Sequence, residues 1–253
     1  MNLSMNFSRN QNIYQPIKLS DTERLISYVK YKHMLSRNLV IAPYKIGILI
    51  PTTSNKMDWK NITQTYLYDV FFKSFLETVN NKHQIIFYIG IDEDEKLWNK
   101  EEGNQILHNL FKNRYNISYK FIYMTNINKG HLTKMWNYLF QLAYNDNCDY
   151  FFQSGDDIHF GTNNWIDDCI AMLKITNNIG VTGPMCDHPH ILTQTFVSRK
   201  HMEIFGCYFP DKILNWYCDD WINQVYTPFL FSPLFKHKCF NLSGVKPRYN
   251  IPN

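Results

Sequence analysis

The sequence lacks several features that would assign it quickly to a class of protein. None of its six cysteines stands in a C-x-x-C pair, which argues against a zinc knuckle. A chain of 253 residues is long enough to bury a sizeable core without disulfides. We therefore expect free, buried thiols in a reducing compartment.

Long apolar runs are also missing. No run reaches the length of about 18 apolar residues that a membrane span needs, so no transmembrane segment is expected. The first residues, MNLSMNFSRNQNIYQ, contain no apolar core of a signal peptide. These absences predict a cytoplasmic protein, located in an infected host cell if the source is a virus.

Positive charge is present without being clustered. The formal net charge is +4, but lysines and arginines are scattered along the chain. A nucleic-acid-binding surface normally gathers its basic residues in one patch, so nucleic acid is not an expected partner. A mildly basic chain suits a small substrate that carries phosphate.

Short apolar runs alternate with amphipathic segments along most of the chain. Ser20 and Glu23 have the spacing of a capping box, which predicts a helix from Asp21 to about Ser36. The runs and their periodicities predict strands at 45–51, 83–91, 117–124 and 148–154, with helices at 61–79, 97–112 and 131–144. Farther along we expect a helix at 164–176, a strand and turn at 178–184, a strand leading into a helix at 193–206, and an aspartate-capped helix within 215–226.

Strands that alternate with helices at spacings of about 30 residues predict βαβ units and a mainly parallel central sheet flanked by helices. Ligands of such sheets lie beyond the carboxyl ends of the strands. The four predicted strands of the first half end in the polar loops TTS, DEDE, TNINKG and GDD. We therefore expect a functional site at this edge of the sheet.

The last of these loops contains two adjacent acids, Asp156 and Asp157, directly after the aromatic run DYFFQ. Two neighbouring carboxylates repel each other unless a cation lies between or near them. The pair either holds a metal ion or forms a solvated acidic turn.

The order of these features resembles the GT-A fold of nucleotide-sugar-dependent glycosyltransferases, most closely family 2 and related viral or microbial members. The resemblance covers about Lys45 to Tyr249 and rests on the pattern of strands and loops. It implies one Rossmann-related α/β domain over 45–253, preceded by an arm and a helix over 1–44. Within the domain, 45–160 would bind the nucleotide sugar, and 161–253 would form the acceptor-side half and the tail.

The resemblance implies that polar residues after the strands bind the nucleotide. Hydroxyl and amide groups would hold the nucleoside, and basic residues of the C-terminal tail would donate to the diphosphate. For Asn137, a purely structural role within its helix is an equal alternative. The implied nucleotide contacts are Thr52, Thr53, Ser54, Asp92, Lys129, Asn137, Asp156, Lys246 and Arg248.

The resemblance also implies a Mn²⁺ or Mg²⁺ ion on Asp157, shared with Asp156 and completed by His237. Such a hard cation would bridge the diphosphate oxygens and stabilise the leaving group. These enzymes usually carry D-x-D, whereas Gly155 stands here where the first acid would be.

The resemblance further implies a catalytic role for a second acidic pair, Asp219 and Asp220. In an inverting enzyme one of them, with Asp220 favoured, would take the proton of the acceptor hydroxyl. In a retaining enzyme the acid would stabilise charge, and a helix N-cap is the structural alternative. The implied acceptor-facing residues are Asp187, Gln194, Trp216 and Trp221.

The resemblance thus predicts a metal-dependent hexosyl- or N-acetylhexosaminyltransferase of glycan biosynthesis. Its donor would be a nucleoside diphosphate sugar, with UDP expected, and its acceptor a hydroxyl group of a glycan or glycoprotein. The main alternative is a non-catalytic GT-A-like module that binds a glycan or nucleotide. A metal-dependent phosphohydrolase is disfavoured because its acids and histidines at two-metal spacing are missing.

Overall fold

The computed structural model describes residues 20–37, 41–98, 100–186, 188, 190–242 and 248–249. The arm expected over 1–19 lies outside the described residues, as do two predicted site residues, Asp187 and Lys246. Among the helices that are described, none has both the length and the apolar character needed to cross a membrane.

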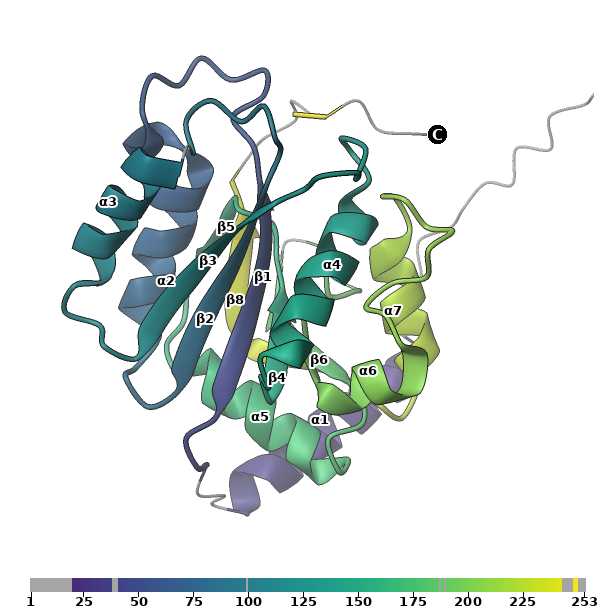
Figure 1. The fold of residues 1–253 in the computed structure, drawn as a ribbon. Helices are drawn as coiled ribbons and strands as arrows, with labels where there is room; N and C mark the ends of the chain where they lie inside the picture. Colours follow the sequence, from purple (N-terminus) through teal and green to yellow (C-terminus); the bar gives the residue numbers. More distant parts are fainter. Residues whose placement is uncertain are drawn as a thin grey trace, which may run out of the picture.

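An eight-stranded sheet forms the centre of the molecule, in the order β3-β2-β1-β4-β7-β6-β8-β5 (Figure 1). Strands β3, β2, β1 and β4 are parallel to one another, and β6 is parallel to β8. Strand β7 is antiparallel to β4 and β6, and β5 is antiparallel to β8. The strands are β1 Lys45–Thr52, β2 Gln84–Ile91, β3 Ile117–Tyr123, β4 Tyr150–Gln153, β5 Ile158–Phe160, β6 Val181–Met185, β7 Thr195–Ser198 and β8 Phe231–Asn241. The prediction of an α/β fold with a mainly parallel sheet is confirmed.

Helices cover both faces of this sheet. Figure 1 shows α2 and α3 against one face and α4 and α7 against the other. One apolar cluster joins the sheet to α1, α2, α3 and α5, and a second joins it to α4, α6 and α7. The helices are α1 Asp21–Ser36, α2 Lys73–Thr78, α3 Lys100–Phe111, α4 Leu132–Asn145, α5 Trp165–Ile175, α6 Arg199–Phe205 and α7 Cys218–Tyr226.

Strand β1 explains why the first half of the chain was predictable. Ile46, Ile48 and Ile50 enter one core cluster while Leu49 enters the other, because successive side chains of a strand point to opposite faces. A strand buried on both faces is apolar along its whole length, which gives a clear signal in the sequence.

The helix predicted over 61–79 is broken into three pieces. A 3₁₀ turn over Ile62–Gln64 and a π-helical segment over Leu67–Phe72 precede α2. Thr65 separates the first two pieces: its hydroxyl donates to the carbonyl of Ile62 at 2.7 Å and accepts from the backbone N–H of Tyr68 at 3.3 Å. Competition of this kind between a side chain and the helical ladder is typical of threonine.

Two predictions in the second half are wrong. The Gly-Pro pair expected in a turn lies inside β6, where a Cβ on Gly183 would come within 2.7 Å of the carbonyl oxygen of Gln194 on the neighbouring chain segment. Helix α7 has Tyr217 rather than an aspartate as its N-cap, and that residue makes no capping hydrogen bond. Both acids of the pair, Asp219 and Asp220, lie in the first turn instead.

Strands β5 and β8 were not predicted. β5 is only three residues long, and β8 falls in what the sequence presented as a basic tail. Exposed residues alternate irregularly with buried ones in β8, and its register against β6 shifts between Leu234 and Lys238. Such a bulged strand has no clean period-2 pattern.

Candidate functional site

The carboxyl ends of β1, β2 and β4 lie side by side, because these strands are parallel and adjacent. Thr52 ends β1, Asp92 follows β2, and Asp156 follows β4 after a short turn. The hydroxyl of Thr52 donates to Oδ2 of Asp156 at 2.6 Å, and the hydroxyl of Thr53 donates to Oδ2 of Asp92 at 3.4 Å. The structure therefore brings the three predicted loops together at one edge, as expected for a ligand site of a parallel sheet.

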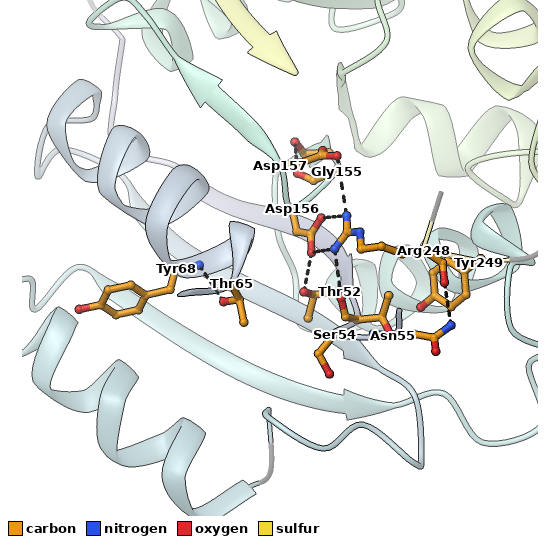
Figure 2. Close-up of polar contacts among 12 residues, drawn as sticks. Thr52, Ser54, Asn55, Thr65, Tyr68, Gly155, Asp156, Asp157, Arg248 and Tyr249 are labelled. Atoms are coloured by element: carbon orange, nitrogen blue, oxygen red, sulfur yellow. Dashed lines mark hydrogen bonds and ion pairs between the residues drawn. The ribbon is translucent and has the colours of Figure 1, made fainter. Parts of the chain in front are cut away.

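Asp156 is the centre of this cluster and is 1% exposed. Its carboxylate is paired with the guanidinium of Arg248, as Figure 2 shows. Nη1 of Arg248 donates to Oδ2 at 2.6 Å, and Nη2 donates to Oδ1. This two-point pairing is the geometry in which an arginine holds a carboxylate most strongly.

Arg248 is fixed by further contacts. Nη2 lies 3.7 Å from Oδ2 of Asp157, and Nη1 donates to the carbonyl oxygen of Thr53 at 3.1 Å. The guanidinium lies over the ring of Tyr66, and the side-chain amide of Asn55 donates to the Arg248 carbonyl at 2.7 Å. Burial alone would lower the pKa of Arg248, but the charge and hydrogen bonds of Asp156 raise it above its ordinary value.

Tyr249 reaches the neighbouring acid. Its hydroxyl donates to Oδ2 of Asp92 at 3.0 Å. Burial raises the pKa of Asp92, against the lowering effects of the Tyr249 hydrogen bond and the charge of Lys129. Lys129 itself is exposed and pairs with Asp94 at 2.5 Å, so it lies at the rim of the cluster.

Ser54 is held by an acid that the sequence analysis did not single out. Its backbone N–H donates to Oε2 of Glu95 at 2.7 Å, and its hydroxyl donates to Oε1 at 2.5 Å. Glu95 closes the acidic DEDE turn after β2, so the turn was the signal that could have identified it. The two residues together fix the loop that follows β1.

Gly155 explains the departure from D-x-D in steric terms. A Cβ at this position would lie 2.6 Å from Oδ1 of Asp157, closer than real Cβ contacts occur. Its backbone N–H donates to Oε1 of Gln194 at 2.9 Å. Gln194, implied as an acceptor residue, therefore lies directly against the acidic turn.

Helix α7 carries the second acidic pair to the same edge. The side chain of Asn223 exchanges hydrogen bonds of 2.9 and 2.8 Å with the backbone of Leu192, two residues before Gln194. Asp219 lies one helical turn before Asn223, on the same side of α7. Strand β6 is parallel to β4 through their shared neighbour β7, and Cys186, at the carboxyl end of β6, is close enough to influence Asp219.

Asp219 has the environment of a proton acceptor. Burial raises its pKa to about 7, the hydrogen bond from the Cys218 thiol opposes this, and the nearby Asp220 and Cys186 add to it. The thiol contact spans 3.4 Å. A carboxyl group with a pKa near neutrality is suited to general acid–base chemistry.

Two implied site residues are engaged elsewhere. Asn137 accepts from the backbone N–H groups of Tyr208 and Phe209 at 3.0 and 2.8 Å and donates to the carbonyl of Phe209 at 2.7 Å. These bonds join α4 to the segment after α6, which is the structural alternative for this residue.

His237 is buried, and its ring nitrogens contact Asp168 at 2.8 Å and Thr162 at 2.9 Å. The backbone carbonyl of Asp157 accepts a hydrogen bond from the N–H of Leu242, which lies five residues after His237 in the chain. At the rise of a strand this separates His237 from the level of Asp157 by about 15 Å. The structure does not bring the two residues together.

The two tryptophans implied for the acceptor lie near α7 with different surroundings. Trp216 is 64% exposed, directly before the N-cap of the helix. Trp221 is half-buried and packs edge-on against Phe205, with ring centroids 5.5 Å apart. Trp216 is therefore the one whose ring is open to a ligand.

Mn²⁺ or Mg²⁺ was implied between Asp156 and Asp157. Nowhere in the described part of the chain do three His, Cys, Asp or Glu side chains gather as a metal site would require. The position that faces both carboxylates is taken by Nη2 of Arg248. With this guanidinium in place, the described residues do not fit a divalent cation.

The fold is shared with solved structures. S. aureus TarS 1–349 in complex with UDP-GlcNAc aligns over 79% of this chain with a TM-score of 0.53 and 11% identity, and its complex with UDP aligns over 78% with a TM-score of 0.51 and 12% identity. The chain spans 60% of the length of these TarS fragments. No family model and no curated protein matches the sequence. The likeness shows a shared fold, consistent with the GT-A-like, Rossmann-related architecture.

Proposed function

We propose that this protein is a glycosyltransferase that moves a sugar from a nucleoside diphosphate sugar, with UDP as the expected nucleotide, to a hydroxyl group of a glycan or glycoprotein. The observation that carries the proposal is the meeting of Thr52, Asp92 and Asp156 at the carboxyl edge of the sheet. A GT-A-like neighbour has been solved with UDP and with UDP-GlcNAc. N-acetylhexosaminyl transfer is therefore the first specificity to test, ahead of hexosyl transfer.

The buried polar groups beside β1 and β2 suit a nucleoside. The carboxylate of Asp92 and the hydroxyl of Thr53 can pair with ribose hydroxyls or with the edge of a base. Arg248 supplies a cation to the adjacent diphosphate. We therefore assign the nucleoside to the region over β1 and β2 and the sugar to the side that faces α7.

In the proposed transfer step, the base is the carboxyl group of α7 whose pKa is raised. The acceptor oxygen attacks the anomeric carbon, and a new C–O bond forms as the bond to the diphosphate oxygen breaks. The bonding pair leaves with the nucleoside diphosphate, and the acceptor proton goes to Asp219. We favour Asp219 over Asp220 because a pKa of about 7 makes its carboxylate a stronger base than an ordinary one while leaving much of it ionised near neutral pH.

The non-catalytic alternative has one observation in its favour. Asp156 is paired with Arg248, which also lies 3.7 Å from Asp157, so the chain itself supplies a cation to the acidic turn, as a purely structural turn would need. A binding module would hold a nucleotide or glycan without turnover. Release of UDP from UDP-GlcNAc in the presence of candidate acceptors separates it from an enzyme.

A thermal-shift titration with UDP, GDP, CDP and ADP, each with Mn²⁺ or with EDTA, tests the proposed site. A ligand that binds only the folded state raises the unfolding midpoint by mass action. We expect UDP to stabilise the protein and Asp92→Asn to weaken the effect. If no nucleotide shifts the midpoint under any condition, the proposed function is wrong. The sequence predicted a metal requirement, and the comparison of Mn²⁺ with EDTA in the same titration tests that prediction.

A further inference from the structure

We propose that the guanidinium of Arg248 is the cation of the nucleotide site and takes the place of a divalent metal ion. A nucleoside diphosphate would then bind equally well with and without Mn²⁺ or Mg²⁺. The inference rests on the proposed function, since it concerns how the same site holds its diphosphate.

The first argument is the position of the charge. Adjacent carboxylates need a cation close to both, and Nη2 of Arg248 is bonded to Asp156 and lies 3.7 Å from Asp157. A divalent ion shared by these acids would have to occupy the same place. Arg248 and a metal ion are therefore mutually exclusive there.

The second argument is how firmly Arg248 is held. Its side chain is only 14% exposed, and Thr53, Tyr66 and Asn55 fix its guanidinium and its backbone carbonyl. A metal ion would have to expel a buried, doubly bonded guanidinium from its carboxylate. Separating the partners of such a pair is strongly unfavourable.

The third argument is the donors that remain. A guanidinium has five N–H groups. Among the described residues, Asp156 accepts from two of them and the Thr53 carbonyl from a third. The separation from Asp157 is too long for a hydrogen bond, so two N–H groups have no hydrogen-bond partner among the described residues and could donate to phosphate oxygens. Arginine binds phosphates in this forked manner.

The test measures UDP affinity by calorimetry for the full chain in EDTA and in Mn²⁺. The wild type is expected to bind with dissociation constants that agree within about twofold, since no metal takes part. Arg248→Ala is expected to bind at least about tenfold more weakly in EDTA, because charge-assisted hydrogen bonds are lost. Mn²⁺ is expected to restore much of that affinity, because both carboxylates become accessible to the ion.

The outcomes separate this inference from the proposed function. If the wild type binds UDP only with Mn²⁺, the inference is overturned while the proposed function stands. If UDP binds under neither condition, the proposed function fails first. Because the wild-type comparison needs no substitution, it decides the matter even if Arg248→Ala does not fold.

Two further variants sharpen the result. Arg248→Lys keeps the charge but not the fork, so it should fold and bind UDP with intermediate affinity in EDTA. Arg37→Ala removes an exposed arginine at the end of α1 and should bind like the wild type. Stronger binding by Arg248→Ala in EDTA would mean that Arg248 blocks the site, which would also overturn the inference.

Discussion

The hydroxyl of Thr52 donates a hydrogen bond of 2.6 Å to Oδ2 of Asp156, which joins the last residue of β1 to the acidic turn after β4. Both residues are buried. Thr52→Val keeps the shape and removes the donor, which leaves Oδ2 with the bond from Arg248 as its one remaining partner among the described residues. We expect the free energy of unfolding to fall by about 1–2 kcal/mol, measured by urea denaturation.

UDP affinity should also fall in Thr52→Val, because the Thr52 hydroxyl orients the Asp156 carboxylate, which belongs to the proposed site. Thr63→Val is the matched control, since Thr63 is exposed and its hydroxyl donates to the neighbouring Asn61 side chain at 2.6 Å, away from the acidic turn. If Thr52→Val is as stable as this control, the hydrogen bond does not contribute to the fold as described.

Gly155 gives a prediction about geometry rather than charge. In Gly155→Ala the new Cβ would fall 2.6 Å from Oδ1 of Asp157, so that carboxylate must rotate. Because the clashing atom is the end of a side chain, stability should change little. UDP affinity should fall by about tenfold, measured by calorimetry.

Gly103→Ala in α3 serves as the control for this substitution. Its Cβ meets the ring of Phe121 at 3.0 Å, and the residue lies on a helix away from the acidic turn. UDP affinity should not change there. Unchanged affinity in Gly155→Ala as well would show that the position of Asp157 does not matter for binding.

The fold of the first half could be predicted because parallel strands buried on both faces are apolar throughout. The same reasoning failed for β8, whose exposed Lys236 and Lys238 interrupt the pattern and whose bulge removes the period. Helix 61–79 was predicted as one piece because apolar spacing alone does not distinguish α from π turns. Phe71, Phe72 and Phe75 are all buried in the broken arrangement.

The candidate site was predictable only where strand order determines it. Thr52, Asp92 and Asp156 follow neighbouring parallel strands, so their proximity follows from the topology. The sequence also indicated that two adjacent acids need a cation. The resemblance pointed to Arg248 as a nucleotide contact, but the sequence could not show that its guanidinium pairs with Asp156, 92 positions away along the chain. Such a contact depends on the path of the whole chain.

Asp167 provides a structural comparison outside the site. It accepts hydrogen bonds from Lys82 at 2.5 Å and from Asn80 at 3.1 Å, and it contacts His83 at 3.2 Å. Burial would raise the pKa of Asp167, but these partners lower it well below its ordinary value. Its contribution to stability is therefore present above the unfolded-state pKa of about 4 and is lost as the pH falls below that value.

Asp167→Asn should accordingly be less stable than the wild type at pH 7, with a difference that shrinks as the pH is lowered below about 4. Urea unfolding across this range measures the effect. UDP affinity at pH 7 should be unchanged. An equal loss of stability at every pH would contradict the role given to the carboxylate charge.

Asp219 links activity and stability through one pKa. The group must be ionised to accept a proton, and its pKa is raised to about 7. The rate kcat/KM should therefore be constant above pH 7 and fall about tenfold per pH unit below it. Asp219→Asn should transfer sugar about 10²–10⁴-fold more slowly than the wild type while still binding UDP. If Asp220→Asn loses transfer and Asp219→Asn does not, the base is Asp220.

The variant Asp219→Asn should also be more stable than the wild type at alkaline pH. Because the folded pKa lies above the unfolded one, ionisation disfavours the folded state increasingly as the pH rises from about 4 to 7. Asparagine removes this effect. The unfolding midpoint of Asp219→Asn should exceed that of the wild type by more at pH 8 than at pH 5. A difference that is independent of pH would mean that Asp219 titrates normally in the folded protein, and it would then be no better suited than any surface acid to accept the proton.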